Sequence, residues 1–179
     1  MKFHCKTKII LSAGSAFFSC QNSKVYCTVN GPIDSQNLNK ECLLEIKWSQ
    51  GTILNHKHID KYYSKILEEI LNEYIVKEYL PYKTLYLDFY CVGNDNLLFC
   101  AVNAALLALV DACIPIKCLF FGLSSFTDDN EVFVYDSKLV YQHSFSHSDE
   151  NKALNYLEEI KETILFEINK KFKNKLIKN

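Results

Sequence analysis

Apolar and polar residues alternate along the first fifty residues of the chain, as is typical of β-strands. In the segment 3–9 the odd-numbered positions carry Phe, Cys, Thr and Ile, whereas the even-numbered positions carry His or Lys. Two further apolar segments, 16–20 and 25–29, flank a short polar connection, which predicts a hairpin. A fourth strand is expected over 42–48.

The pattern changes after residue 59. From Asp60 onward the apolar residues recur every three or four positions, which predicts an amphipathic helix that ends before Pro81. A strand is expected over 84–92. The segment 97–113 is apolar on nearly every side of a helix, so this helix is predicted to be central and buried.

The last third of the chain predicts three strands and a helix. The strands are expected over 116–123, 131–135 and 138–145, with residues 127–130 as a hairpin loop. A final amphipathic helix is expected to begin near Ser148, whose hydroxyl suits the capping position. The predicted order, β4-α-β-α-β3-α, is that of an α+β fold with sheets packed on helices.

Composition limits the size and chemistry of this fold. The 179 residues are 49% apolar, which is enough for one core, so a single domain over 1–179 is predicted. The net charge is −1, and all 20 basic residues are lysine. Chemistry that requires an arginine fork on phosphate therefore has no such side chain. The lysine-rich end, 170–178, is interpreted as solvated helix surface, with an RNA-binding tail as the alternative.

Cysteine and histidine patterns give no metal or cofactor prediction. Most of the eight cysteines lie in apolar runs, where reduced, buried thiols are expected, so a reducing compartment is predicted. The pairs His56 with His58 and His143 with His147 have spacings that suit a metal, but no Cys-x-x-Cys pair accompanies them. No apolar run reaches the length of about 20 residues that a bilayer requires.

Three carboxylates stand out because they lie in or beside apolar elements. Asp88 falls inside a predicted strand, Asp111 ends the apolar helix, and Asp136 ends a strand next to Ser137. For Asp111 a structural role is predicted, with a lysine or a main-chain amide as its partner. For Asp136 a turn role is predicted.

Two segments resemble the RNase PH family. Residues 13–15 followed by 23–32, which end in Gly31-Pro32, resemble the family's N-terminal hairpin. Residues 97–117 are similar to its central helix, with Asn-Ala-Ala near the start, Ala-Leu-Val-Asp-Ala near the end, and Ile-Pro after it. The strand pair that ends at Asp136 resembles the pair that follows the central helix in this family. The resemblance implies an RNase PH-like domain (ribosomal protein S5 domain 2-like).

The resemblance also bears on catalysis, because the family holds both phosphorolytic exoribonucleases and non-catalytic ring subunits of the RNA exosome. Active members have a stretch such as Gly-Gly-Thr-Arg before the central helix, where this chain has Asp95, Asn96, Leu97 and Leu98. Leu98 stands at the arginine position, and the acidic residues expected after Asp136 are missing. The resemblance thus implies a degenerate phosphate site and no catalytic residue.

The implied function is that of a non-catalytic structural subunit of the exosome ring. Its partners would be other RNase PH-like subunits in a six-membered ring, RNA-binding cap subunits, a hydrolytic nuclease and single-stranded RNA, in nucleus, nucleolus and cytoplasm. Lys6, Lys8 and Lys24 are the candidate RNA contacts. Two alternatives stay open: a phosphorolytic 3′-5′ exoribonuclease of the same family, and a free-standing module that binds RNA or protein.

Overall fold

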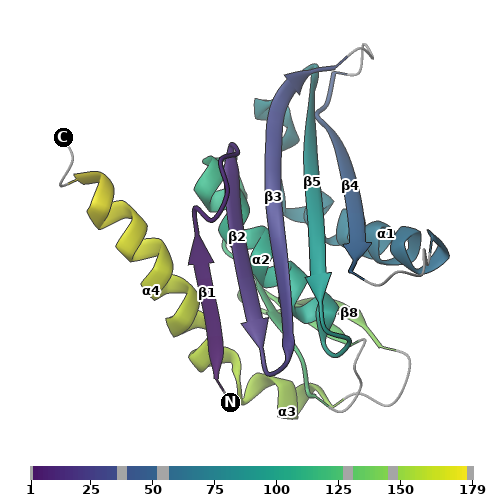
Figure 1. Ribbon diagram of the computed structural model, residues 1–179, viewed down its shortest axis with the longest axis vertical. Helices are drawn as coiled ribbons and strands as arrows, with labels where there is room; N and C mark the ends of the chain where they lie inside the picture. The colour runs from purple at the N-terminus through teal and green to yellow at the C-terminus, as the bar shows by residue number, and fades with distance from the viewer. Residues whose placement is uncertain (1, 36–39, 52–56, 127–130, 145–148, 177–179) are drawn as a thin grey trace.

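A mixed five-stranded sheet, with helices on one of its faces, forms the body of the structure (Figure 1). This computed structural model describes residues 2–35, 40–51, 57–126, 131–144 and 149–176. The strands are β1 (Phe3–Thr7), β2 (Gly14–Cys20), β3 (Ser23–Asp34), β4 (Leu43–Gln50), β5 (Lys83–Val92), β6 (Phe121–Leu123), β7 (Val132–Tyr135) and β8 (Leu139–His143). The helices are α1 (Lys57–Tyr74), the short 3₁₀ helix η1 (Lys77–Tyr79), α2 (Leu97–Ala112), α3 (Glu150–Leu154) and α4 (Leu157–Leu176).

The large sheet has the strand order β1-β2-β3-β5-β4, and a second sheet has the order β6-β7-β8. Neighbouring strands of the large sheet are antiparallel except β4 and β5, which are parallel. The alternation in the sequence decides which face is covered: on β3, Val25, Cys27 and Val29 are fully buried, and the residues between them are partly exposed. The predicted α+β order of elements is confirmed.

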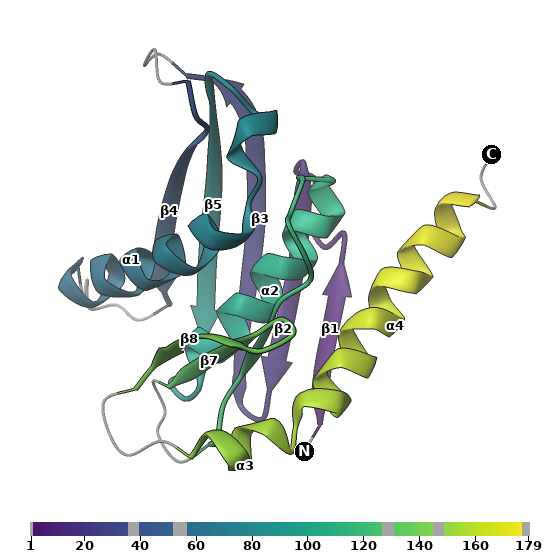
Figure 2. The same cartoon turned by 180° about the vertical axis from the view of Figure 1, so that it is seen from behind.

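Helix α2 is the centre of the core, as its sequence predicts. Figure 2 shows it lying against the strands of the large sheet, and α1 packs on β4 on the same face of the sheet. The close approach of α2 to β2 requires a glycine at residue 14. A Cβ at Gly14 would lie 2.3 Å from the carbonyl oxygen of Ala108 and 2.4 Å from the main-chain nitrogen of Ala112.

The one polar residue inside the apolar part of α2 fastens the small sheet to the helix. The Asn103 side chain is fully buried. It donates to the carbonyl oxygen of Gly122 at 3.0 Å and accepts from the N–H of Gly122 at 3.0 Å. Because both main-chain groups of Gly122 are satisfied by one amide, β6 is held in a fixed register on α2.

Two predicted elements differ from the structure. The strand expected over 116–123 is reduced to β6, because the preceding residues pair with the end of α1 instead: the Val76 N–H donates to Pro115 and the Lys117 N–H donates to Tyr74. The neighbouring predicted strands are confirmed with shifts of one or two residues at their ends. The predicted loop 127–130 lies outside the described residues.

The final helix is also not continuous, since α3 and α4 are separate. The interruption places the Tyr156 ring edge-on against Phe126, with ring centroids 5.1 Å apart. The cap of α3 is Asp149, whose carboxylate accepts from the N–H of Lys152. The predicted cap, Ser148, lies outside the described residues.

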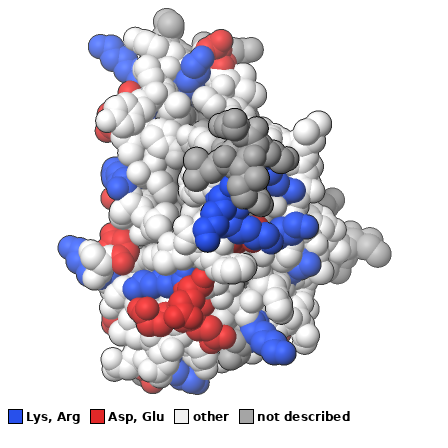
Figure 3. Space-filling view, turned by 90° about the vertical axis from the view of Figure 1, so that its left-hand side faces the viewer, with Lys and Arg blue, Asp and Glu red and all other residues white. Residues whose placement is uncertain are grey.

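Helix α4 lies along the edge strand β1 (Figures 1 and 2). Its first turn carries Glu158 and Glu159, and its second half carries Lys170, Lys171 and Lys173. Figure 3 shows this side of the molecule, where lysines gather near the C-terminal end and acidic side chains lie below them. This distribution complements the helix dipole. Among the described residues, no helix has the length and apolar character needed to cross a membrane.

Candidate functional site

The start of α2 is the place where the sequence predicts a degenerate phosphate site. Asn96 precedes the helix with φ of 54°, a left-handed conformation that asparagine tolerates, and its side chain does not cap the helix. The N–H of Asp95 donates to the Ser23 hydroxyl at 3.2 Å. Leu97 and Leu98 are 2% and 1% exposed. The first turn of α2 therefore has buried apolar side chains. An arginine that binds phosphate would instead have to extend from this turn into solvent.

A buried polar cluster, formed by Asn96, Ser124, Ser125 and Glu131, closes this end of the helix from the side. The Ser124 hydroxyl lies 2.8 Å from Asn96 Oδ1 and 2.9 Å from Glu131 Oε1. The Glu131 carboxylate also accepts from the N–H of Ser125. Asn96 is 5% exposed, and the other three residues are fully buried.

The cluster changes what the helix end can bind. A helix N-terminus attracts anions through its free N–H groups and its dipole. Here a carboxylate of the chain, Glu131, contacts the same Ser124 hydroxyl that contacts Asn96, the residue that precedes the helix. A second carboxylate, Asp95, is next to it in sequence, and the chain has no arginine to offset either charge.

Asp136, for which a turn role is predicted, lies at the opposite end of β7 from Glu131. The two residues are five positions apart along an extended chain, which corresponds to about 16 Å. Main-chain N–H groups of Ser137 and Lys138 donate to the Asp136 carboxylate and lower the pKa of Asp136. The structure thus gives Asp136 the predicted turn role and does not bring it to the start of α2.

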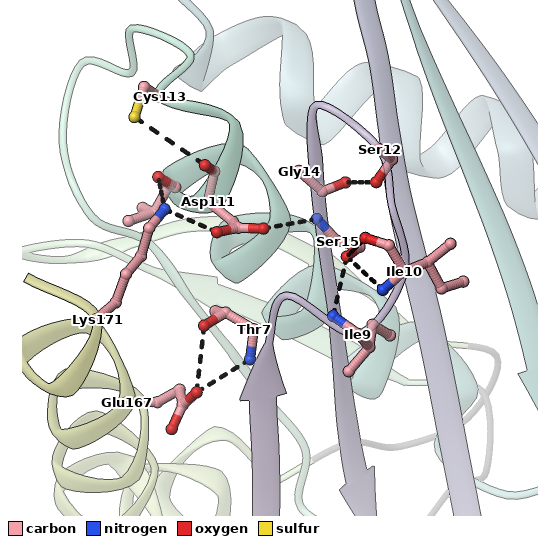
Figure 4. A network of polar contacts seen from close by, with 11 residues as sticks. Thr7, Ile9, Ile10, Ser12, Gly14, Ser15, Asp111, Cys113, Glu167 and Lys171 are labelled. Atoms are coloured by element: carbon pink, nitrogen blue, oxygen red, sulfur yellow. Dashed lines mark hydrogen bonds and ion pairs between the residues drawn. The ribbon is translucent and has the colours of Figure 1, made fainter. Parts of the chain in front are cut away.

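The C-terminal end of α2 carries a second buried polar network (Figure 4). Lys171 Nζ lies 2.8 Å from Asp111 Oδ1 and donates to the carbonyl oxygen of Val110 at 2.9 Å. The N–H of Ser15 donates to Asp111 Oδ2 at 3.0 Å. The prediction for Asp111 is confirmed in both of its forms, since a lysine and a main-chain amide are its partners.

The same network corrects the interpretation of the lysine-rich end as solvated surface at one residue, Lys171, whereas Lys170 and Lys173 are exposed as predicted. Lys171 is 6% exposed, because α4 turns it inward against α2. Nearby, Glu167 accepts from both the N–H and the hydroxyl of Thr7, at 3.0 and 3.2 Å. Helix α4 is therefore fixed to β1 and to α2 by charged side chains. The helical periodicity does not predict these contacts, because Lys170 and Lys171 are adjacent lysines and the sequence does not show which of them faces the core.

Ser15, from the segment that resembles the family hairpin, organises the loop before β2. Its hydroxyl accepts from the N–H groups of Ile9 and Ile10, at 3.1 and 3.0 Å, and donates to the carbonyl oxygen of Ile10. The Ile10 and Leu11 side chains are 57% and 104% exposed. The loop thus holds two apolar side chains in solvent on an ordered main chain.

The three candidate RNA-binding lysines are placed differently. Lys6 is exposed on β1, where it is paired in register with Phe17 of β2. Lys24, on β3, holds its ammonium 4.2 Å from the centre of the Phe17 ring. Lys8 follows β1, and its N–H donates to Ser15 at 2.7 Å. Lys6 and Lys24 therefore extend from the same open face of the large sheet.

None of the eight cysteines, which all lie in the described part of the chain, forms a disulfide, and Cys113 and Cys118 are exposed. Burial raises the pKa of Cys5 to about 12 and that of Cys20 to about 11. Within the described part of the chain, no group of three His, Cys, Asp or Glu side chains could hold a metal ion. His56 and His147 lie outside that part, so both histidine pairs stay untested.

Sequence reasoning missed the buried cluster at the start of α2. The sequence pattern predicts Glu131 only as the start of a strand and gives no role to Ser124. The one available signal is that a glutamate opens an otherwise apolar strand, which calls for a buried partner. Its partners, Ser125 and Ser124, lie 6 and 7 residues away in sequence, and Ser124 in turn contacts Asn96, which is 28 residues from Ser124.

Comparison with protein families gives one match over residues 2–115, to the RNase PH family, described as "3′ exoribonuclease family, domain 1". The chain is 34% identical over 128 residues to the Exosome complex exonuclease RRP46 homolog of Arabidopsis thaliana, covering 69% of this chain and 53% of that protein. It is 31% identical over 118 residues to the Putative exosome complex component RRP41 of Caenorhabditis briggsae, covering 58% and 48%. The chain thus spans about half the length of these relatives.

Solved structures with the same fold are found as well. The crystal structure of rice (Oryza sativa) Rrp46 matches with a TM-score of 0.80 at 22% identity, covering 94% of each chain. A chain of the Archaeoglobus fulgidus exosome with RNA bound to the active site matches with a TM-score of 0.68 at 13% identity, covering 98% of this chain and 88% of that one. At these identities the matches establish a shared fold.

Proposed function

Since the chain belongs to the RNase PH (3′ exoribonuclease) family, whose domain 1 it matches, we propose that it is a non-catalytic, structural ring subunit of an RNA exosome. In this function it forms one wall segment of a channel through which RNA is threaded for 3′-5′ processing and degradation. Its partners are other RNase PH-like subunits in a six-membered ring, RNA-binding cap subunits and a hydrolytic nuclease. We place this assembly in the nucleus, the nucleolus and the cytoplasm.

One observation supports the proposal that the chain lacks phosphorolytic activity: α2 begins with buried leucines, and the residue before it is linked through Ser124 to the buried carboxylate of Glu131. Phosphorolysis requires inorganic phosphate to be held beside an RNA backbone that is already anionic. A phosphate held about 6 Å from one carboxylate meets a repulsion of about 3 kcal/mol per charge pair at an effective dielectric constant of about 20. Neither Glu131 nor Asp95 favours such an anion, and no arginine offsets them.

Support for ring membership comes from the relatives. Both curated relatives are named as exosome components, and the similarity to the A. thaliana RRP46 homolog covers 69% of this chain. The A. thaliana protein is also named as an exonuclease, which favours the alternative of a phosphorolytic exoribonuclease, active with groups that a neighbouring subunit donates. The structural subunit and the phosphorolytic exoribonuclease differ in one measurable product, the nucleoside diphosphates that phosphorolysis releases from RNA.

Release of nucleoside diphosphates from RNA in the presence of phosphate tests the catalytic part. We expect none from the purified chain, nor from its complex with its native neighbours, under conditions in which an active RNase PH enzyme degrades the same RNA. Phosphate-dependent release by the complex that is lost when this chain carries a Glu131→Gln or Asp136→Asn substitution would establish the alternative function.

Assembly is tested separately by affinity purification from the native cell, followed by identification of the chains that accompany this one. We expect other RNase PH-like subunits in equimolar amount. A stable monomer that purifies alone would support the free-standing binding module instead.

A further inference from the structure

The open face of the large sheet, which faces the viewer in Figure 1, carries a row of aromatic side chains. Phe17, Tyr26 and Tyr90 are paired in register across β2, β3 and β5, so they point to the same side. Their ring centroids are 5.8 Å apart between Phe17 and Tyr26 and 6.3 Å apart between Tyr26 and Tyr90. Tyr90 is 52% exposed. We call these three residues the aromatic row.

Lysines accompany the aromatic row at three points. Lys24 Nζ lies 4.2 Å from the Phe17 centroid and 5.5 Å from the Tyr26 centroid. Lys6 is paired with Phe17 at one end of the row, and Lys47 is paired with Asp88 on the neighbouring strand at the other end. Lysines therefore accompany the aromatic row along its width, and two carboxylates of the same face, Asp88 and Glu45, lie beside Lys47.

A pocket of about 550 Å³ opens on the same face beside the row. Tyr26 and Tyr90 form its aromatic side, Ile10 from the loop after β1 borders it, and Thr28, Ser49 and Asp88 supply polar groups. This volume lies within the range of small-molecule sites, about 300–1,000 Å³. Asp88 accepts a hydrogen bond from Asn30 at 3.2 Å, and a carboxylate keeps further acceptor positions.

We propose that this open sheet face binds single-stranded RNA, with a base stacked on Tyr26 and Tyr90 in the pocket and the phosphates on Lys24, Lys6 and Lys47. A stacking platform with flanking cations is the chemistry by which single strands are bound without a groove that fits a duplex. The pattern favours RNA over a protein partner, because binding to a protein surface of the same area does not require aromatic rings that alternate with lysines. The inference does not require the proposed ring function, because the site lies within this chain alone.

The pocket also sets a base preference. A carboxylate such as that of Asp88 accepts hydrogen bonds, so it favours bases with an exocyclic amino group, such as cytosine, over uracil, which offers one ring N–H between two carbonyl oxygens. The Asp88→Asn substitution supplies a donor and removes this difference.

The test is fluorescence anisotropy of labelled C12 and U12 RNA with the full chain, alone or in its native complex, over a series of salt concentrations. Stacking on one aromatic side chain corresponds to a loss of roughly tenfold to hundredfold in affinity when that side chain is removed. We expect Tyr90→Ala and Tyr26→Ala each to show this loss. The matched control is Tyr79→Ala, which removes a tyrosine that is 75% exposed in η1, outside the sheet; it leaves the affinity unchanged.

Two further readouts separate RNA binding from a general effect on folding. Lys24→Met lowers the slope of log affinity against log salt concentration by about 0.7, the value for one phosphate contact on a single strand. Asp88→Asn brings the affinities for C12 and U12 together. Circular dichroism of each variant establishes that it is folded.

The proposal is overturned if the wild-type chain binds neither RNA, or if Tyr90→Ala and Lys24→Met bind as tightly as wild type. It is also overturned if Tyr90→Ala leaves RNA affinity unchanged and removes a co-purifying protein, since the face is then a protein interface. Phosphorolytic activity, which would defeat the proposed function, leaves these affinities unaffected, so the two failures are distinguishable.

Discussion

The buried pair of Asp111 and Lys171 offers the sharpest test of how this chain is held together. Both side chains are 4% exposed, and Lys171 Nζ also donates to Val110. The Lys171→Met substitution keeps the apolar stem and removes the ammonium, so Asp111 remains as a buried charge with the Ser15 N–H as its neighbour. Removal of one partner of a buried pair costs about 3–5 kcal/mol. That is a large part of the total of about 5–15 kcal/mol expected for a folded domain.

The assay is urea unfolding followed by the fluorescence of Trp48, which is the single tryptophan and is 3% exposed. The adjacent lysine provides the control: Lys170 lies 3.8 Å from Glu167 and its side chain is 57% exposed, so Lys170→Met changes stability by about 0–1 kcal/mol. Adding Asp111→Asn to Lys171→Met removes the stranded charge and restores about 1 kcal/mol or more. Equal losses for the two lysine variants, or no recovery in the double variant, would refute the reasoning.

Three further outcomes follow from the same geometry. Gly14→Ala forces a Cβ to within 2.3 Å of the main chain of α2 and lowers stability by about 1–3 kcal/mol, measured by the same unfolding. Burial raises the folded-state pKa of Cys5 to about 12 and that of Cys20 to about 11, from 9.0, so unfolding releases protons at alkaline pH. The stability contributed by these thiols is fully present below about pH 9 and falls as pH rises towards 12. Urea unfolding midpoints from about pH 8 to about pH 11 measure this fall. Leu98→Arg yields no phosphorolysis, because the neighbouring carboxylates remain; nucleoside diphosphate release by that variant contradicts this.

Much of the fold followed from patterns that are local in sequence. The alternation along β1 to β3 and the period of α1 are direct consequences of which side of each element meets the core. The apolar composition of α2 likewise required a buried helix. The break between α3 and α4 and the shortening of β6 were missed, because both depend on packing with residues that are distant in the chain, Phe126 for the first and Tyr74 for the second.

The candidate sites divide in the same way. The sequence by itself determined that the chain has no arginine for phosphate, that leucines begin the central helix, and that Asp111 needed a partner. Only the tertiary structure decided that this partner is Lys171, that Glu131 closes the start of α2, and that lysines and aromatic rings meet on one open sheet face. The physical reason is that strand register and helix docking set these distances, and both are fixed by the whole core at once.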